Sequence, residues 1–282
     1  MSDVGRAAAG GWPRAAARVR GWLAHHRRPA RPSAPRMRRF TRRHIAVGVA
    51  ALVVVLAGTL VLLDAVAVVD ARALPAPVQR VFNVITDYGK SGWFLWPLGV
   101  VLALAAASAG RLSDRAGLLV ASLMTRAMFL FMAIALPGIA ANILKGIIGR
   151  ARPFVGGAPD PYLFSPWTWG HAYASFPSGH ATTAGSVAVA FGALWPRLRP
   201  LLWAYVLAIL ISRVVVTAHH PSDVVAGAVF GAVGAWLVRR FYAARGLGFA
   251  IATDGRIYPM AGPSRRRLAA AIKRVAARRS AQ

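Results

Sequence analysis

Residues 45–63 read IAVGVAALVVVLAGTLVLL and contain no charged side chain. As a helix with a rise of about 1.5 Å per residue, this stretch would be about 28 Å long, which matches the hydrocarbon core of a bilayer. It is too long for the apolar region of a typical signal peptide, which has about 7–15 residues. We therefore predict a membrane-spanning signal anchor.

Five further apolar stretches follow along the chain. They cover Gly92–Gly110, Ala116–Leu144, Gly179–Trp195, Leu201–Ala218 and Val224–Tyr242. The last three are shorter and carry polar or charged residues at one end. The pattern predicts an all-α polytopic membrane protein built as a bundle of six transmembrane helices.

The composition excludes several other classes of protein. Of the 282 residues, 57% are hydrophobic, and 35 Lys and Arg stand against 8 acids, which gives a formal net charge of +27. The absence of cysteine excludes a disulfide scaffold and a cysteine nucleophile. The high apolar content excludes a wholly disordered basic chain. No helix-turn-helix or zinc-ligand pattern accompanies the charge, so we predict no nucleic-acid partner.

The positions of the basic residues predict the orientation. Residues 1–43 hold twelve arginines, and the stretch from Arg239 to Gln282 holds eleven Lys and Arg. Six spans put both tails on one side, and only seven basic residues fall on the other. Because basic residues accumulate on the cytoplasmic side, we expect both termini to be cytoplasmic and the protein to lie in the inner (plasma) membrane. The tails would also attract anionic lipid head groups.

These patterns suggest three regions. Residues 1–43 form a basic, disordered cytoplasmic tail, and residues 44–243 form the six-span membrane domain. Residues 244–282 form a basic cytoplasmic C-terminal tail, in which Leu268, Ile272 and Val275 predict an amphipathic helix. Residues 249–258 predict a small hairpin within this tail.

Polar side chains gather at one end of the predicted bundle. In the six-span arrangement, one outer rim receives Lys145, Arg152, His180, Arg213, His219 and Asp223. Three cations near a single acid suit an anion with several oxygens, because arginine forks match phosphate geometry. The sequence Pro177-Ser178-Gly179-His180 adds a helix start whose free N–H groups favour phosphate.

The two histidines at this rim could supply the reactive groups. One imidazole can attack phosphorus while the other donates a proton, because histidine titrates near neutrality. Asp223 follows His219 by four residues and could orient its ring. His220 is placed equally well by spacing alone. Two histidines of ordinary pKa predict a bell-shaped or flattened rate profile around neutrality.

The motifs resemble a known three-part signature. Lys145-x6-Arg152-Pro153, Pro177-Ser178-Gly179-His180 and Ser212-Arg213-x5-His219-x3-Asp223 are similar to those of the type 2 phosphatidic acid phosphatase superfamily, which includes bacterial lipid phosphatases, glucose-6-phosphatase and vanadium haloperoxidases. The resemblance implies a haloperoxidase-like helical bundle over about residues 44–243. It also implies chemistry without a metal or other cofactor.

The resemblance implies a role for each matching residue. His219 would be the nucleophile that forms a phosphohistidine, and Asp223 would orient it. His180 would protonate the leaving oxygen and later activate water. The phosphate would be held by Lys145, Arg152, Ser178, the Gly179 amide and Arg213.

The resemblance predicts a membrane phosphatase with a periplasmic site that acts on a lipid phosphate or diphosphate. Undecaprenyl diphosphate is the leading expectation, and phosphatidylglycerophosphate, phosphatidate and lipid A phosphates stay open. A lipid phosphotransferase and a non-enzymatic scaffold or transport subunit are the alternatives. The sequence does not indicate an oligomeric state.

Other polar residues and segments have simpler interpretations. Asp64 either pairs with Arg126 or marks the end of the first span, and Arg150 is expected to be a solvated flank. His171 is expected to be a loop histidine within residues 154–176, a long segment over the site. Helical spacing from Val78 to Ile85 predicts a short helix on the outer membrane surface.

Overall fold

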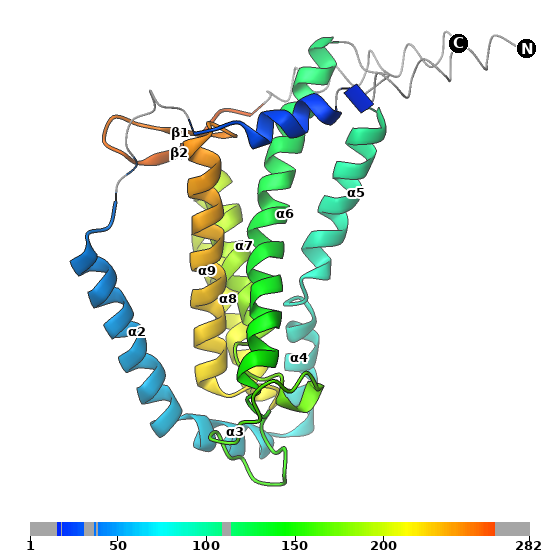
Figure 1. Ribbon diagram of the computed structural model, residues 1–282. Coiled ribbons are helices and arrows are strands. Elements are labelled where there is room, and N and C mark those ends of the chain that lie inside the picture. Colours follow the sequence, from blue (N-terminus) through cyan, green and yellow to red (C-terminus); the bar gives the residue numbers. More distant parts are fainter. Residues whose placement is uncertain (1–15, 18, 31–36, 38, 109–113, 263–282) are drawn as a thin grey trace, which may run out of the picture. The chain divides into compact units, whose positions relative to one another are not determined.

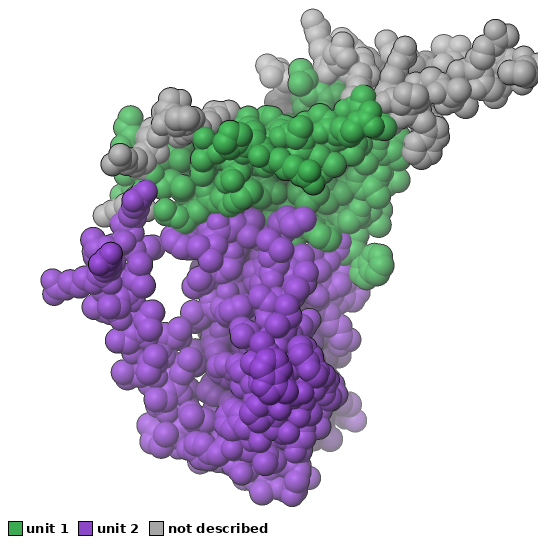
Figure 2. Space-filling view, in the orientation of Figure 1, with its two compact units in different colours: residues 1–38, 96–131, 240–282 green, residues 39–95, 132–239 purple. Residues whose placement is uncertain are grey.

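The computed structural model describes residues 16–17, 19–30, 37, 39–108 and 114–262. Contacts divide the chain into two compact units, coloured separately in Figure 2. Unit 1 comprises residues 1–38, 96–131 and 240–282, and unit 2 comprises residues 39–95 and 132–239. All residues of the predicted signature belong to unit 2.

The described chain is mostly helical, which confirms the all-α prediction (Figure 1). Its helices are α2 (Arg42–Leu62), α3 (Asp64–Arg72), α4 (Ala76–Asp87), α5 (Gly92–Ser108), α6 (Asp114–Ile148), α7 (Gly179–Leu194), α8 (Arg199–Val215) and α9 (Pro221–Ala244). Two short 3₁₀ turns are η2 (His171–Tyr173) and η3 (Pro196–Leu198). The short helix expected around Val78–Ile85 is present as α4, and its place on the outer membrane surface stays a prediction.

Five stretches of the described chain are long and apolar enough to cross a membrane. They are Arg42–Leu62, Ala76–Ser108, Ala116–Ile148, Pro196–Val215 and Pro221–Ala244. The fourth predicted span corresponds to α7, which has only 16 residues and would be about 24 Å long. The predicted count of six spans is therefore not confirmed.

Helix α7 is largely buried within unit 2. Eleven of its residues are buried, including the polar residues Thr182, Thr183 and Ser186. Hydroxyl groups bond within the bundle: Thr182 Oγ1 donates to Ser178 O at 2.8 Å, and Ser186 Oγ donates to Gly231 O at 3.1 Å. A helix that is buried on nearly all sides does not need a full lipid-facing length.

Glycines allow α7 and α9 to approach closely. A Cβ atom on Gly185 would lie 2.1 Å from Ala228 O, and one on Gly231 would lie 2.0 Å from Thr182 O. Backbone contact of this kind is typical of helix pairs in membranes, where small residues let two helices pack closely. This contact sets the spacing between the starts of α7 and α9.

A core of mainly small residues joins α7, α8 and α9. Its buried members are Ala181, Ala184, Ala188, Val206, Ile209, Val224 and Ala228. Ile85 of α4 packs against this cluster. The core therefore holds four helices whose ends carry the polar residues described below.

Helix α2 has no buried residue, although its sequence is almost entirely apolar. Thr41 caps its start by accepting a hydrogen bond from His44 N at 3.2 Å. An apolar helix with an exposed surface fits contact with lipid. At its end the chain turns at Leu63 and continues into α3, which begins at the buried Asp64.

Within unit 1, strands β1 (Phe249–Ile251) and β2 (Ile257–Pro259) form an antiparallel pair. This pair confirms the predicted hairpin. Phe249 packs edge-on against Phe129, with ring centroids 4.8 Å apart. Residues 19–27 are helical, although the sequence analysis expected a disordered tail there. The predicted amphipathic helix around Leu268–Val275 lies outside the described residues.

Candidate active site

The predicted site residues lie at helix ends and in the segments between helices of unit 2. They are Lys145 at the end of α6, Arg152 in the segment that follows, Ser178, Gly179 and His180 at the start of α7, Arg213 at the end of α8, His219 before α9 and Asp223 in the first turn of α9. Ser178 N donates to Asp223 O at 3.0 Å. A Cβ atom on Gly179 would lie 3.8 Å from Lys145 Cε. The fold thus brings the three motifs to one place.

The segment before α7 orients two of the three cations. Lys145 Nζ donates to Ala174 O at 2.8 Å, and Arg152 Nε donates to His171 O at 3.0 Å. Arg152 N also donates to Ala172 O at 2.8 Å. These bonds use only part of the donor capacity of each side chain, because Lys has three donors and Arg has five. The remaining donors are available to an anion.

Arg213, the third cation, is held by helix α4. Its Nη1 donates to Thr86 Oγ1 at 2.8 Å, and both residues are buried. The next turn of the chain contacts His180, since a Cβ atom on Gly89 would lie 2.9 Å from His180 Cδ2. Neither Thr86 nor Gly89 was predicted to belong to the site. No local signal could have found them, because Thr86 and Arg213 are 127 positions apart.

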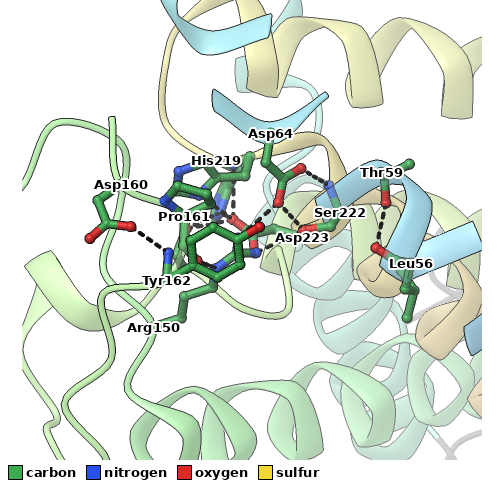
Figure 3. A network of polar contacts seen from close by, with 12 residues as sticks. Leu56, Thr59, Asp64, Arg150, Asp160, Pro161, Tyr162, His219, Ser222 and Asp223 are labelled. Atoms are coloured by element: carbon green, nitrogen blue, oxygen red, sulfur yellow. Dashed lines mark hydrogen bonds and ion pairs between the residues drawn. The ribbon is translucent and has the colours of Figure 1, made fainter. Parts of the chain in front are cut away.

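His219 and Asp223 are both buried, and they face each other (Figure 3). His219 Nδ1 lies 3.8 Å from Asp223 Oδ2, which is within ion-pair range but longer than a hydrogen bond. Ser175 Oγ lies between the two groups. It donates to Asp223 Oδ2 at 2.6 Å and lies 3.5 Å from His219 Nδ1. With Nδ1 turned toward these two residues, Nε2 is the ring nitrogen left for chemistry.

His220 is also close to Asp223, so the ambiguity of the sequence remains in the geometry. Its Nδ1 lies 3.4 Å from Asp223 Oδ2, and its backbone N donates to the same oxygen at 2.9 Å. Neither ring nitrogen of His220 has a hydrogen-bond partner among the described residues.

The start of α7 provides unused hydrogen-bond donors. Ser178 occupies the N-cap position, but its side chain forms no capping bond. Its Oγ is buried and has no partner among the described residues. The first backbone N–H groups of a helix also lack partners within that helix. Hydroxyl and backbone donors at a helix start suit a phosphate oxygen.

The environment of Arg150 differs from the one predicted from the sequence. Arg150 is not a solvated flank, because its exposed fraction is only 2%. Its Nη1 donates to Asp223 Oδ1 at 2.5 Å, and its Nη2 donates to Asp64 Oδ2 at 2.8 Å. The two acids are 86 and 73 positions away from Arg150 in sequence. Inspection of its flanking residues therefore could not reveal either partner.

The same bonds answer the open question about Asp64 and Arg126. Asp64 pairs with Arg150 instead of Arg126. Within unit 1, Arg126 donates to Ser122 Oγ at 2.6 Å and to Met260 O at 2.8 Å. Asp64 and Arg126 therefore have separate partners and do not pair with each other.

The positive charge of the site contributes to the lowered pKa values of three histidines, His171, His180 and His219. The pKa of the exposed His171 is lowered first by the Arg152 charge, then by burial and by the charges of Lys145 and Arg213. Burial lowers the pKa of His219 to about 3; Asp223 opposes this shift, and the Lys145 and Arg213 charges add to it. His219 is therefore neutral at pH 7, as a nucleophilic imidazole must be.

Comparison with protein families gives one match, the PAP2 superfamily, over residues 126–247. A lipid A 1-phosphatase of Rhizobium johnstonii is 36% identical over 195 residues, which cover 68% of this chain and 79% of that protein. A lipid A 1-phosphatase of Rhizobium etli is 35% identical, with coverage of 68% and 83%.

Two solved structures are also similar. Aquifex aeolicus LpxE shares 22% identity over 60% of this chain and 89% of its own, with a TM-score of 0.44. A PAP2-type phosphatidylglycerolphosphate phosphatase of Bacillus subtilis shares 19% identity over 69% and 94%, with a TM-score of 0.48. From its family match and its relatives, this multi-pass membrane chain belongs to the PAP2 superfamily and is a phosphatase.

Proposed function

We propose that the protein removes the 1-phosphate of lipid A at the periplasmic face of the inner membrane. The similarity to two lipid A 1-phosphatases over about four-fifths of their length is the observation that carries this proposal. It favours lipid A over undecaprenyl diphosphate, the leading expectation from sequence. A phosphate attached to a membrane lipid also suits a site at the ends of apolar helices.

In the proposed reaction, His219 Nε2 attacks phosphorus while the bond from phosphorus to the lipid oxygen breaks. His180 donates its proton to that oxygen, and the product is a phosphohistidine. Water then attacks the phosphohistidine, with His180 accepting a proton, and inorganic phosphate leaves. One phosphate oxygen would therefore come from water, which ¹⁸O-labelled water would show. Transfer to a second lipid would leave no such label in free phosphate.

The cations supply electrostatic stabilisation in this mechanism. Lys145, Arg152 and Arg213 would surround the equatorial phosphate oxygens, where negative charge is concentrated during transfer. Ser178 Oγ and the Gly179 amide would add donors at the start of α7. Asp223 would stabilise the positive charge that His219 gains in the transition state.

Charge asymmetry supports the proposed orientation. The N-terminal tail of twelve arginines and the basic C-terminal tail would lie in the cytoplasm, where basic segments are retained. They would also bind anionic head groups of the inner leaflet. The catalytic end would then face the periplasm.

A substrate panel tests the proposed function directly. Protein purified in detergent is incubated with lipid A, undecaprenyl diphosphate, phosphatidylglycerophosphate or phosphatidate, with EDTA present. We expect lipid A to react fastest, to lose only the 1-phosphate by mass spectrometry, and to react at the same rate without EDTA. Faster release from undecaprenyl diphosphate, or loss of the other lipid A phosphate, would contradict the proposed specificity. Restoration of an EDTA-inhibited rate by Mg²⁺ would contradict metal-free chemistry.

The pH dependence of kcat/KM tests the assignment of His219. Because burial lowers its pKa to about 3, the ring stays neutral and nucleophilic as the pH falls from 7 to 5. Burial and the Arg213 charge also lower the pKa of the proton donor His180 to about 3, so both histidines titrate well below neutrality. We therefore expect no loss of activity between pH 7 and pH 5 and an acid limb below about pH 4, in place of a decline just below neutrality. Because the second pKa of a phosphate monoester is also about 6, a half-loss near pH 6.5 contradicts this assignment only if it stays at the same pH with lipids of different phosphate pKa.

A further inference from the structure

We propose that Asp64 and Arg150 are positioning residues: they fix the Asp223 carboxylate and leave a net negative charge beside His219. This inference rests on the proposed function, in which Asp223 supports a nucleophilic His219. Asp64 lies outside the three motifs that match the family, and Arg150 occupies an unspecified position within the first of them. Figure 3 shows the two residues joined to Asp223 in one buried polar network.

Every guanidinium nitrogen of Arg150 has a partner. Its Nε donates to Pro161 O at 3.0 Å, and its Nη2 donates to Asp64 Oδ2 at 2.8 Å. Its Nη1 donates to Ser222 Oγ at 2.8 Å and to Asp223 Oδ1 at 2.5 Å. The planar fork of an arginine can bridge two carboxylates in this way, whereas a lysine is a single point of charge.

Asp64 holds the start of the helix that carries Asp223. Its Oδ1 accepts a hydrogen bond from Ser222 N at 2.8 Å, and its Oδ2 accepts one from Ser222 Oγ at 2.5 Å. Asp64 is fully buried, with an exposed fraction of 0%. A carboxylate that binds N–H groups at a helix start stabilises that end of the helix. The contact connects the first residue of α3 to α9 across 158 positions.

Both oxygens of Asp223 are therefore constrained. Oδ1 accepts from Arg150, while Oδ2 accepts from Ser175 Oγ at 2.6 Å and from His220 N at 2.9 Å. Three residues fix its plane, and Oδ2 faces His219 Nδ1 at 3.8 Å. Catalysis benefits when such groups need no rearrangement during the reaction.

The charges of the network explain why two acids are present. Arg150 alone would neutralise Asp223 and weaken its attraction for a positively charged His219. Asp64 balances Arg150, so the three groups together carry one net negative charge. Lys145 and Arg213 also act on His219, with positive charge, and His220 lies beside it. Buried charges interact strongly, so the balance near the ring matters.

Substitutions that separate charge from geometry test this inference. Arg150→Gln changes the net charge of the network to −2. Arg150→Lys keeps the net charge at −1 but removes the planar guanidinium fork. Asp64→Asn makes the net charge zero with almost no change in side-chain volume. We expect each substitution to lower kcat by about 10–100-fold. This is the loss found when a residue that orients a metal ligand is replaced, and Asp64 and Arg150 orient Asp223 in a similar way. KM should change little, because none of these residues contacts phosphate. Asp70→Asn, an exposed acid on the same helix α3, serves as the matched control and should retain wild-type kcat.

The position of the acid limb distinguishes positioning from mere structural support. Extra negative charge stabilises the imidazolium, so Arg150→Gln should move the acid limb of kcat/KM to higher pH by about 1 unit or more. Arg150→Lys should leave the limb in place, and Asp64→Asn should move it to lower pH. A folding defect would reduce the amount of active protein, but it would not move the acid limb in opposite directions in Arg150→Gln and Asp64→Asn. The comparison of Gln with Lys at position 150 suffices if Asp64→Asn does not fold.

Two results would overturn different claims. Equal acid limbs in Arg150→Gln and Arg150→Lys, or unchanged kcat in both, would refute the role of the network. If His219→Ala, assayed in parallel, kept its activity, the proposed phosphohistidine mechanism would fail instead. Each outcome is read on full-length protein in detergent with the same lipid substrate.

Discussion

His219→Ala is expected to reduce phosphate release by about 10⁴-fold or more, the loss found when a nucleophile that acts with its partners is removed. The reason is geometric. His219 is buried beside Asp223, and its ring is neutral at pH 7, so its removal takes away the nitrogen proposed to attack phosphorus. The measurement is the initial rate with lipid A for wild type and variant, together with the thermal midpoint of each.

Covalent labelling separates His219 from its neighbour. Wild-type protein quenched during turnover should carry an acid-labile phosphoryl group on His219, and His220→Ala should still acquire it. His44→Ala is a suitable control, because His44 is an exposed histidine at the start of α2. Phosphoryl label on His220, or full activity of His219→Ala, would refute the assignment. Such an outcome would be compatible with the position of His220, whose Nδ1 is 3.4 Å from the same carboxylate.

Gly231→Ala is expected to produce a large loss of stability. The added Cβ would lie 2.0 Å from Thr182 O and 2.9 Å from Ser186 Oγ, and the first of these neighbours is backbone. Helices α7 and α9 would have to separate, at a cost of about 1–3 kcal/mol for overpacking. Separation would also strain the bond from Ser178 N to Asp223 O, which connects the start of α7 to Asp223. Activity should therefore fall together with stability.

Gly138→Ala provides the matched control for this substitution. Gly138 also lies within a helix, α6, but no atom lies within 4 Å of a Cβ built there. Replacing a helical glycine by alanine in open space gains about 0.5–1 kcal/mol, so the control should be slightly more stable than wild type. Thermal midpoints in detergent measure both effects. A midpoint for Gly231→Ala at or above that of wild type would refute the proposed close contact.

Much of the fold could be predicted from the sequence because its signals are local. The uncharged run at residues 45–63 is now α2, and the hairpin around Asp254 and Gly255 is present. The run at residues 179–195 was interpreted less well. Its helix α7 has 16 residues, so its prediction as a span is not confirmed, and only packing reveals that most of the helix is buried.

The candidate site also contains residues that could be predicted from the sequence and residues that could not. The motifs identified the residue types suited to phosphate, and the fold places them at neighbouring helix ends. The supporting residues carried no comparable signal: Thr86 behind Arg213, Gly89 against His180, and Asp64 with Arg150 behind Asp223. Arg150 was even interpreted as a solvated flank, because a charge next to an apolar stretch usually is one.

The sequence by itself determined the helical membrane class, the family signature and the set of groups suited to phosphate, since these depend on composition and short spacing. Only the tertiary structure decided which charges are buried and which partners they have. The reason is that a buried ion pair depends on distance in space. Asp64 and Ser222 are 158 positions apart, yet their hydrogen bonds set the start of the helix that carries Asp223.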